Sequence, residues 1–314
     1  MDRRSFIKRS GFFGAASMLG PALTAGAMTL KGNNSYPDIC IINGENIFEN
    51  TKLLLENLGG MGRFVKPGQK VGLLVNSEFT NRGAYVSPDM PLSVAKMCFD
   101  AGASEVRNLQ MISPRYWERT PLSEQYAEVI DNLVNNEYKP SSAKFDPEHF
   151  SRVEVPGISL KEAEVVNDFF TCDVYINISI AKHHGSSIYT GALKNTMGIN
   201  TRENCVTFHT GGPERNDPDH LAQCIVDLNK LRLADLTIVD ANEVIVTNGP
   251  SGPGEIITPR KVVAGTDMVA VDHLSTTLIG HEYGAILTVE KAHQDGLGDM
   301  DFRKLNIKEV HPVA

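Results

Sequence analysis

The chain has 314 residues, of which 41% are hydrophobic and 22% charged, values typical of a globular protein with a large core. Its formal net charge of -8 argues against nucleic acid as the natural partner, because phosphate backbones require clustered Lys and Arg. The 5 cysteines show no CxxC spacing, so we expect no iron–sulfur cluster.

The N-terminus has the features of an export signal. Residues 3–8 read RRSFIK, which is the twin-arginine pattern, and the weakly apolar stretch that follows is too short for a stable membrane span. Ala25-Gly26-Ala27 fits a cleavage site. We therefore expect residues 1–27 to be a signal peptide, the twin-arginine export machinery to be a partner, and the periplasm to be the location. The alternative is a basic amphipathic tail.

Strand and helix patterns then alternate along the chain. In its first half the expected elements are strand Asp38–Ile42, helix Asn46–Leu58, strand Lys70–Val75, helix Pro91–Ala101, a strand from Val106, and helix Ser123–Leu133 with Ser123 as N-cap. After the polar segment Pro140–Phe150 they are strand Asp173–Ile180, helix His220–Leu231, strands Leu236–Asp240 and Lys261–Ala264, and helix Met268–Ile279 with Asp267 at its entry. This alternation predicts an α/β fold, a mainly parallel sheet with helices on both faces. Residues 28–314 then form a single domain with room for a small second lobe.

The segment Ala181–Gly198 is the candidate site, because ligands of open parallel sheets bind beyond the carboxyl ends of the strands. The groups in it that are or can become cationic are Lys182, His183, His184 and Lys194. Thr190 is a suitable N-cap and Gly198 a suitable stop for a two-turn helix that would direct N–H groups into the same crevice. Together they predict a site for a carboxylate or phosphate. The alternative is a solvated basic loop.

These residues also carry a family resemblance. Lys182, His184, the run Thr190–Asn195 and Gly198 resemble the hallmark of the domain-of-unknown-function 362 family. Further matches are His209, Asp240, Gly249–Gly254 and Asp267–Asp272, and the similarity extends from about Asp38 to Gly298. Many members also carry cysteine-rich ferredoxin segments. This chain has none, so the resemblance implies no electron-transfer role.

A fainter resemblance is to the catalytic domain of the nickel-pincer lactate racemases. His184, Lys194 and His209 are spaced similarly to a motif in which a Lys holds the cofactor and a later His ligates the metal. Thr80 and Arg82 resemble a substrate-binding pair. The second catalytic His is absent from residues 110–119, and racemisation needs a proton acceptor on each face, so the resemblance implies a shared scaffold more than a shared activity.

The expected roles follow from these two lines of reasoning. We expect His184 to be a general base or acid with a pKa near neutrality, and Lys194 to be a second anchor or a covalent cofactor attachment point. His209 is the candidate metal ligand, or else a hydrogen-bonded loop residue. Substrate contacts are expected from Lys182, Thr190, Asn195, Arg82 and Asp240. Turn formation with Asn242 is the alternative for Asp240.

The sequence thus favours an enzyme that acts on a small anionic molecule, a carboxylate or phosphate, in a crevice lined by His and Lys. A bound metal or a covalently held cofactor is compatible with this site. The alternative is a non-catalytic small-molecule or metal binding protein of the periplasm, which would use the same crevice without turnover.

Overall fold

The computed structural model describes residues 36–136 and 143–312. They belong to one compact unit that begins at Tyr36. The expected signal peptide, residues 1–27, lies outside the described residues. Within the described ranges, no helix combines the length and the apolar character needed to cross a membrane.

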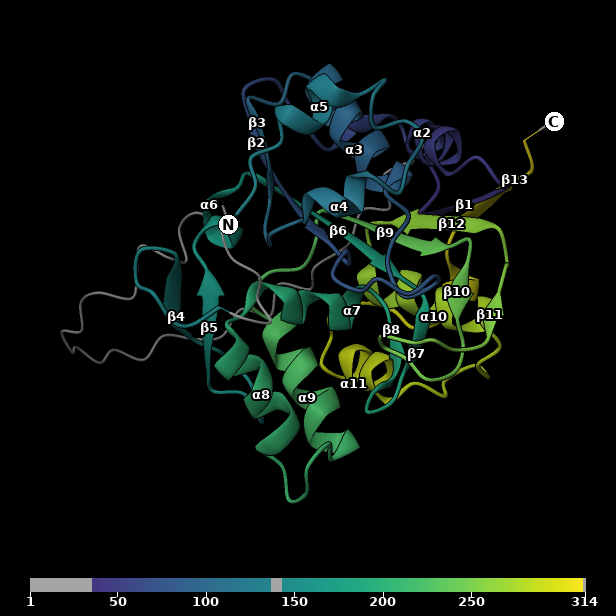
Figure 1. Cartoon of the computed structure of the whole chain (residues 1–314). Helices are drawn as coiled ribbons and strands as arrows, with labels where there is room; N and C mark the ends of the chain where they lie inside the picture. Colours follow the sequence, from purple (N-terminus) through teal and green to yellow (C-terminus); the bar gives the residue numbers. More distant parts are fainter. Residues whose placement is uncertain (1–35, 137–142, 313–314) are drawn as a thin grey trace, which may run out of the picture. The chain divides into compact units, whose positions relative to one another are not determined.

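A seven-stranded sheet forms the centre of this unit, in the order β13-β1-β12-β9-β6-β2-β3 (Figure 1). Its strands are β1 (Ile39–Asn43), β2 (Lys70–Val75), β3 (Glu105–Asn108), β6 (Val174–Ile180), β9 (Leu236–Ala241), β12 (Lys261–Gly265) and β13 (Ile307–Val310). The pairs β3–β2, β2–β6, β6–β9 and β1–β13 are parallel, so the prediction of a mainly parallel sheet is confirmed.

Strand β12 departs from this pattern, because it is antiparallel to both β9 and β1. The chain passes from β9 to β12 through the hairpin of β10 (Val244–Ile245) and β11 (Ile256–Ile257), with no helix between them. A parallel neighbour would need a long crossover, whereas an antiparallel one does not. The sequence pattern places β12 correctly but does not reveal its direction.

Helices cover both faces of the sheet, as predicted. On one side lie α2 (Ile47–Asn57), α3 (Asp89–Asp100), α4 (Pro114–Trp117) and α5 (Ala127–Asp131); on the other lie α7 (Ala192–Asn195), α9 (Pro218–Asn229), α10 (Met268–Leu278) and α11 (Leu287–Gln294) (Figure 1). Helix α2 packs on β1 and β12, whereas α7 packs on β6 and α10 on β9. Every residue of β6 is buried, as its continuous apolar sequence requires.

Capping residues decide where the helices begin. Asn46 accepts a hydrogen bond from the Glu49 amide at 3.1 Å, and Asp267 accepts one from Ala270 at 3.0 Å, as expected for N-caps. The prediction of Ser123 as N-cap is wrong, because α5 begins only after Tyr126, whose ring stacks on Phe48 at 4.8 Å. This tertiary contact lies outside the local pattern.

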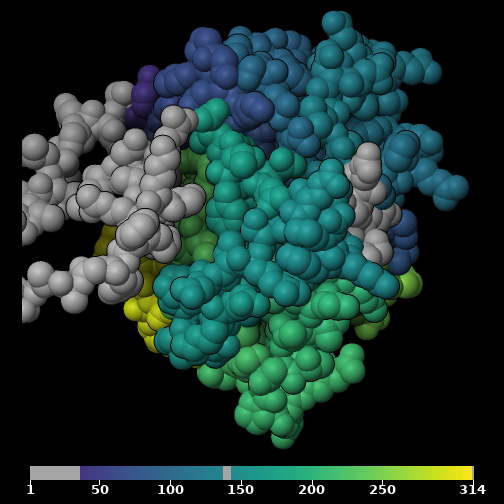
Figure 2. All heavy atoms as spheres, turned by 90° about the vertical axis from the view of Figure 1, so that its left-hand side faces the viewer, coloured from purple at the N-terminus to yellow at the C-terminus, as the bar shows by residue number. Residues whose placement is uncertain are grey.

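Besides the β10–β11 hairpin, two further small antiparallel ribbons stand apart from the main sheet: β4 (Phe150–Glu154) with β5 (Glu162–Val166), and β7 (Lys182–His184) with β8 (Ile188–Thr190). The first is followed by α6 (Asp168–Thr171) and adjoins the start of α8 (Arg202–Thr210), where Thr201 Oγ1 donates to Glu164 Oε2 at 2.6 Å. Figure 2 shows these teal and green segments side by side on one face. The polar segment Pro140–Phe150, for which the sequence suggests an irregular lobe boundary or a surface excursion, is described only from residue 143, and its last residue, Phe150, begins β4.

Candidate functional site

The β7–β8 hairpin directly follows β6 and carries the first candidate residues. Lys182 pairs with Thr190, and His184 pairs with Ile188. Alternate side chains of a strand point to opposite faces, so Lys182 and His184 share one face and His183 points to the other. There, His183 Nδ1 accepts a hydrogen bond from the Gly249 amide at 3.0 Å.

Lys182 is completely buried at the base of the cluster. Its ammonium group donates to Asn76 Oδ1 at 3.2 Å and to the Ala84 carbonyl, and it lies 4.1 Å from the centre of the Phe79 ring. Burial, reinforced by the charge of Lys194, holds the pKa of Lys182 well below its usual value. The charge of Glu78 has the opposite and smaller effect on the pKa of Lys182.

His184 is a neutral hydrogen-bond donor. Its Nδ1 accepts the amides of Ser186 and Ser187 at 3.1 and 3.2 Å, so this nitrogen carries the lone pair and Nε2 carries the hydrogen. Burial is the main reason that its pKa falls to about 2, with the charge of Lys194 adding to the effect. This differs from the near-neutral pKa expected from the sequence.

His209 complements His184. It lies near the end of α8, and the two rings are nearly parallel, with centres 6.4 Å apart and an angle of 16°. Its Nδ1 lies 2.9 Å from Asn216 Oδ1, which can only accept, so Nδ1 carries the hydrogen and Nε2 the lone pair. Burial and then Lys194 lower the pKa of His209, while Asn216 opposes them. The two imidazoles therefore offer one donor and one acceptor.

Lys194 completes the cluster from the last turn of α7. The residue is partly exposed, and its amine contacts Met197 Sδ at 3.5 Å. Burial lowers the pKa of Lys194 to about 8. The neighbouring Cys205 thiol donates to the Met197 carbonyl at 3.3 Å, and burial raises its pKa to about 12.

Sequence reasoning missed Cys205. It lies four residues before His209 on α8, a spacing that places two side chains on the same face of a helix. That spacing was the available signal, but only the fold shows that this face of α8 turns toward Lys194.

The predicted anion site at a helix N-terminus is already occupied. Gly191, not Thr190, is at the N-cap of α7, and the Ala192 and Leu193 amides donate to the Asp272 carboxylate at 2.6 and 2.8 Å. The prediction of Thr190 as N-cap is therefore wrong, because a carboxylate from α10 takes that role. Helix α7 is a single turn continued by a 3-10 turn at Thr196–Ile199, in place of the expected two-turn helix.

Asn195, expected to contact substrate, lies in a buried carboxamide network. It donates to Asn177 Oδ1 at 2.8 Å and to the Leu74 carbonyl at 3.2 Å, and it accepts from Asn76 Nδ2 at 3.1 Å. From Asn177 the network continues through Thr196 to Asn229 on α9. Through these contacts, Asn195 fixes α7 against β2 and β6.

Arg82 and Asp240, also expected to contact substrate, have partners of their own. The exposed guanidinium of Arg82 forms a two-pronged ion pair with Glu243. The buried Asp240 carboxylate accepts the Ser87 and Asn242 amides at 2.8 and 2.9 Å, so the turn with Asn242 is present. Burial raises the pKa of Asp240 to about 6. The fold thus gathers His184, His209, Lys194 and Lys182 but gives these two residues structural contacts.

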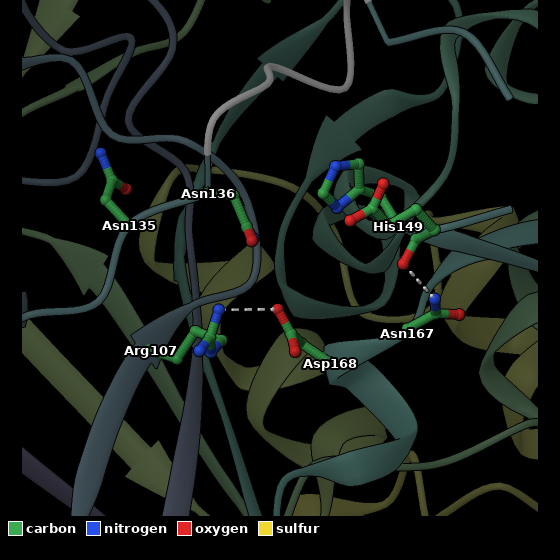
Figure 3. Close-up of a pocket in the computed structure, with 7 residues that line it drawn as sticks. Arg107, Asn135, Asn136, His149, Asn167 and Asp168 are labelled. Atoms are coloured by element: carbon green, nitrogen blue, oxygen red, sulfur yellow. Dashed lines mark hydrogen bonds and ion pairs between the residues drawn. The ribbon is translucent and has the colours of Figure 1, made fainter. Parts of the chain in front are cut away.

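A separate polar pocket of about 250 Å³ lies beside β3 and the β4–β5 ribbon (Figure 3). It is lined by Arg107, Asn135, Asn136, Glu148, His149, Asn167 and Asp168. Within it, Arg107 pairs with Asp168 at 3.3 Å and Asn167 Nδ2 donates to the Glu148 carbonyl at 3.0 Å (Figure 3). No residue of the His184 cluster is among these lining residues.

The His184 cluster does not fit a metal site made of protein ligands. His184 Nε2 carries a hydrogen and the Cys205 thiol is protonated, which leaves His209 Nε2 as the ready ligand. Among the described residues, three metal-binding side chains converge only at Asp146, Glu148 and His149, where both carboxylates are exposed. We therefore derive no metal-dependent step.

Comparison with known proteins places this site in a family. The model of the domain of unknown function DUF362 matches residues 70–277, and the chain belongs to that family. It is 26% identical over 263 residues to a thylakoid-associated protein of Synechocystis sp., covering 81% of this chain and 75% of that protein. Among solved structures it resembles the lactate racemase apoprotein from Thermoanaerobacterium thermosaccharolyticum, with 15% identity and a TM-score of 0.43. That match covers 82% of this chain but only 56% of the racemase chain.

Proposed function

We propose that the cluster of His184, His209, Lys194 and Lys182 binds a small anionic molecule, a carboxylate or phosphate, and acts on it as an enzyme. One observation carries this proposal. The His184 and His209 rings lie 6.4 Å apart, and the charge of Lys194 lowers the pKa of both imidazoles and of Lys182, while the charge of Glu78 has the opposite effect on Lys182. Burial lowers these pKa values most, and a bound anion would offset both the burial and the repulsion.

The two imidazoles would have different roles in the reaction. His184 Nε2–H would donate to a ligand oxygen, where a fixed donor stabilises developing negative charge. His209 Nε2 would accept a proton as the general base. Sequence reasoning gave the base role to His184, but its Nδ1 is taken by two amides, and this arrangement favours His209.

The test is a side-chain NMR titration of ¹⁵N-histidine-labelled protein with inorganic phosphate and with glycolate. Either anion should raise the pKa of His209 by about one pH unit, as a nearby opposite charge does. His293 on α11, whose side chain is 43% exposed, provides the internal control. If chloride at equal ionic strength gives the same shift, or if His209 and His293 respond alike, the anion-site proposal fails.

A non-catalytic binding protein is the second candidate, favoured by the neutrality of His184, which leaves His209 as the titrating imidazole of the pair. The variant His209→Gln separates the two. Phosphate affinity retained together with loss of turnover of an identified substrate supports the enzyme. Turnover unaffected by this substitution would remove His209 from the mechanism.

We also propose that the chain is exported by the twin-arginine route to the periplasm. The RRSFIK sequence at residues 3–8 and the short apolar stretch after it support this. Replacing Arg3 and Arg4 together by Lys should retain the protein in the cytoplasm, whereas Arg9→Lys should not. Equal periplasmic fractions for all three proteins would contradict the proposal.

A further inference from the structure

The chain contains two Asn–Gly sequences, Asn43–Gly44 and Asn248–Gly249. In such a pair the backbone nitrogen of the glycine can attack the side-chain amide of the asparagine, because glycine has no Cβ to hinder the approach. The attack closes a succinimide ring and expels ammonia. It requires that the asparagine side chain is free to turn and that a base takes the hydrogen of the glycine amide.

The fold opposes both requirements at Asn43, which ends β1. The side-chain amide of Asn43 donates to Glu309 Oε1 at 2.9 Å and to the Val310 carbonyl at 3.2 Å, so it is held in place. The Gly44 amide donates to the Arg260 carbonyl at 2.9 Å. A carbonyl oxygen accepts this hydrogen bond but is too weak a base to remove the hydrogen.

Asn248 lies in the exposed loop between β10 and β11. Its backbone is left-handed, with φ of 52°, a conformation that asparagine tolerates in turns. Its side-chain amide donates to the Pro253 carbonyl at 3.4 Å, which is longer than an ordinary N–H···O hydrogen bond. The side chain of Asn248 is therefore held more weakly than that of Asn43.

An imidazole lies against the Gly249 amide. His183 Nδ1 accepts the hydrogen bond of this amide at 3.0 Å, so this nitrogen carries the lone pair. The lone pair of an imidazole takes up a proton far more readily than a carbonyl oxygen does, and histidine is the commonest general base in proteins. A second contact keeps the two segments together, since the Gly185 amide donates to the Gly249 carbonyl at 3.1 Å.

We propose that Asn248 is a site of deamidation and that His183 is the base for this reaction. The Gly249 nitrogen passes its proton to His183 Nδ1 and attacks the side-chain carbonyl carbon of Asn248. A new C–N bond forms, the bond to the amide nitrogen breaks, and the proton leaves His183 on the departing ammonia. Water then opens the succinimide at either carbonyl and gives aspartate or isoaspartate. One water is consumed and one ammonia is released, with no oxidant or reductant.

The modification alters the contact between this loop and the β7–β8 hairpin. Either product adds a negative charge close to His183. Isoaspartate also lengthens the backbone before Gly249 by one methylene group, so the contacts with His183 and Gly185 are not both kept. The same hairpin carries His184, so deamidation at this position acts on an element of the candidate site. The inference itself does not depend on the proposed function.

The main experiment follows deamidation in the unaltered protein. The protein is incubated near neutral pH, and the peptides that contain Asn43 and Asn248 are quantified by mass spectrometry over time. Asn248 should deamidate at least about tenfold faster than Asn43, because two hydrogen bonds must break before the side chain of Asn43 can turn. In urea, where the fold is lost, the two rates should be nearly equal. If Asn248 reacts no faster than Asn43 in the folded protein, or if urea leaves the ratio unchanged, the fold does not select Asn248 and the proposal fails.

The role of His183 has a separate test. In His183→Asn a side-chain oxygen replaces Nδ1 as the acceptor, so the hydrogen bond can be kept while the base is removed. This substitution should slow deamidation of Asn248 at least about tenfold, as loss of a general base does, whereas His293→Asn should not. An unchanged or faster rate in His183→Asn would show that the imidazole only anchors the loop.

Hydrogen exchange tests the effect on the hairpin. The isoaspartate form is separated by chromatography, and exchange of the Gly185 amide is compared with that of the unmodified protein. Exchange should be faster in the isoaspartate form, because the Gly249 carbonyl no longer protects this amide. Equal exchange in the two forms would refute the effect on the hairpin.

Discussion

Replacing Gly191 by Ala tests how rigidly the start of α7 is held. The backbone at Gly191 is extended, with φ of -146°, so an Ala meets no backbone strain there. Its Cβ, however, would lie 2.3 Å from Asp272 Oδ1, 2.4 Å from Tyr189 Cε1 and 2.6 Å from the Tyr189 hydroxyl. The side chains of Asp272 and Tyr189 are both buried, and Asp272 caps the helix.

The expected cost follows from these contacts. Carbon atoms pack best at about 3.5–4.0 Å, so the two neighbours must move by about 1 Å. Overpacking of this kind costs about 1–3 kcal/mol. Moving Asp272 away from two amides adds about 1 kcal/mol for a weakened cap. We expect Gly191→Ala to lower the free energy of unfolding by about 2–4 kcal/mol.

Urea-induced unfolding measures this, with Gly185→Ala as the matched control. Gly185 lies in the same hairpin region, and its added Cβ would meet nothing closer than the Gly249 carbonyl at 3.6 Å. The control should change the free energy of unfolding by less than about 0.5 kcal/mol. If the two variants have equal free energies of unfolding, the Asp272 side chain moves away from the added Cβ at little cost. That result would refute the conclusion that α7 is rigidly anchored.

Three other substitutions test the structural assignments. Asn195→Ala should lower the unfolding free energy by about 2–4 kcal/mol, because Asn177 and a buried carbonyl lose their partner; a loss below about 1 kcal/mol in urea denaturation would argue against the network. Arg82→Ala should leave the urea midpoint of unfolding and the phosphate affinity unchanged, because its guanidinium is exposed to solvent. Weaker binding in calorimetry would return Arg82 to the site. Burial raises the pKa of Asp240 to about 6, so the folded state keeps a proton that the unfolded state releases above about pH 4. The stability of the wild type relative to Asp240→Asn should fall by up to about 3 kcal/mol as the pH rises through this window, and an unchanging difference between about pH 4.5 and 7.5 would contradict this.

Local patterns predicted the elements well where burial is continuous. Lys70–Val75 forms a strand with the predicted ends, and Asp267 caps its helix as expected. In each case the deciding interaction lies within a few residues of the element. The α/β class and the mainly parallel sheet follow from such signals.

Long-range contacts decided the rest. Asp272 caps α7 from 80 residues away, and Glu243 pairs with Arg82 across 161 residues. The sequence alone does not show that these carboxylates lie next to α7 and Arg82. It therefore predicted Thr190 as the cap of α7 and Arg82 as a substrate contact. The tautomer of His184 is likewise set by how the hairpin amides of Ser186 and Ser187 turn toward the ring.

The carboxamide network from Asn76 to Asn229 consists of side chains that neither gain nor lose a proton between acid and alkaline solution. This part of the frame that holds α7 is thus insensitive to acidity. The Asp272 carboxylate that caps α7 is not, because burial raises its pKa to about 7, so a change observed at Lys194 or His209 during a titration must be compared with the titration of that cap.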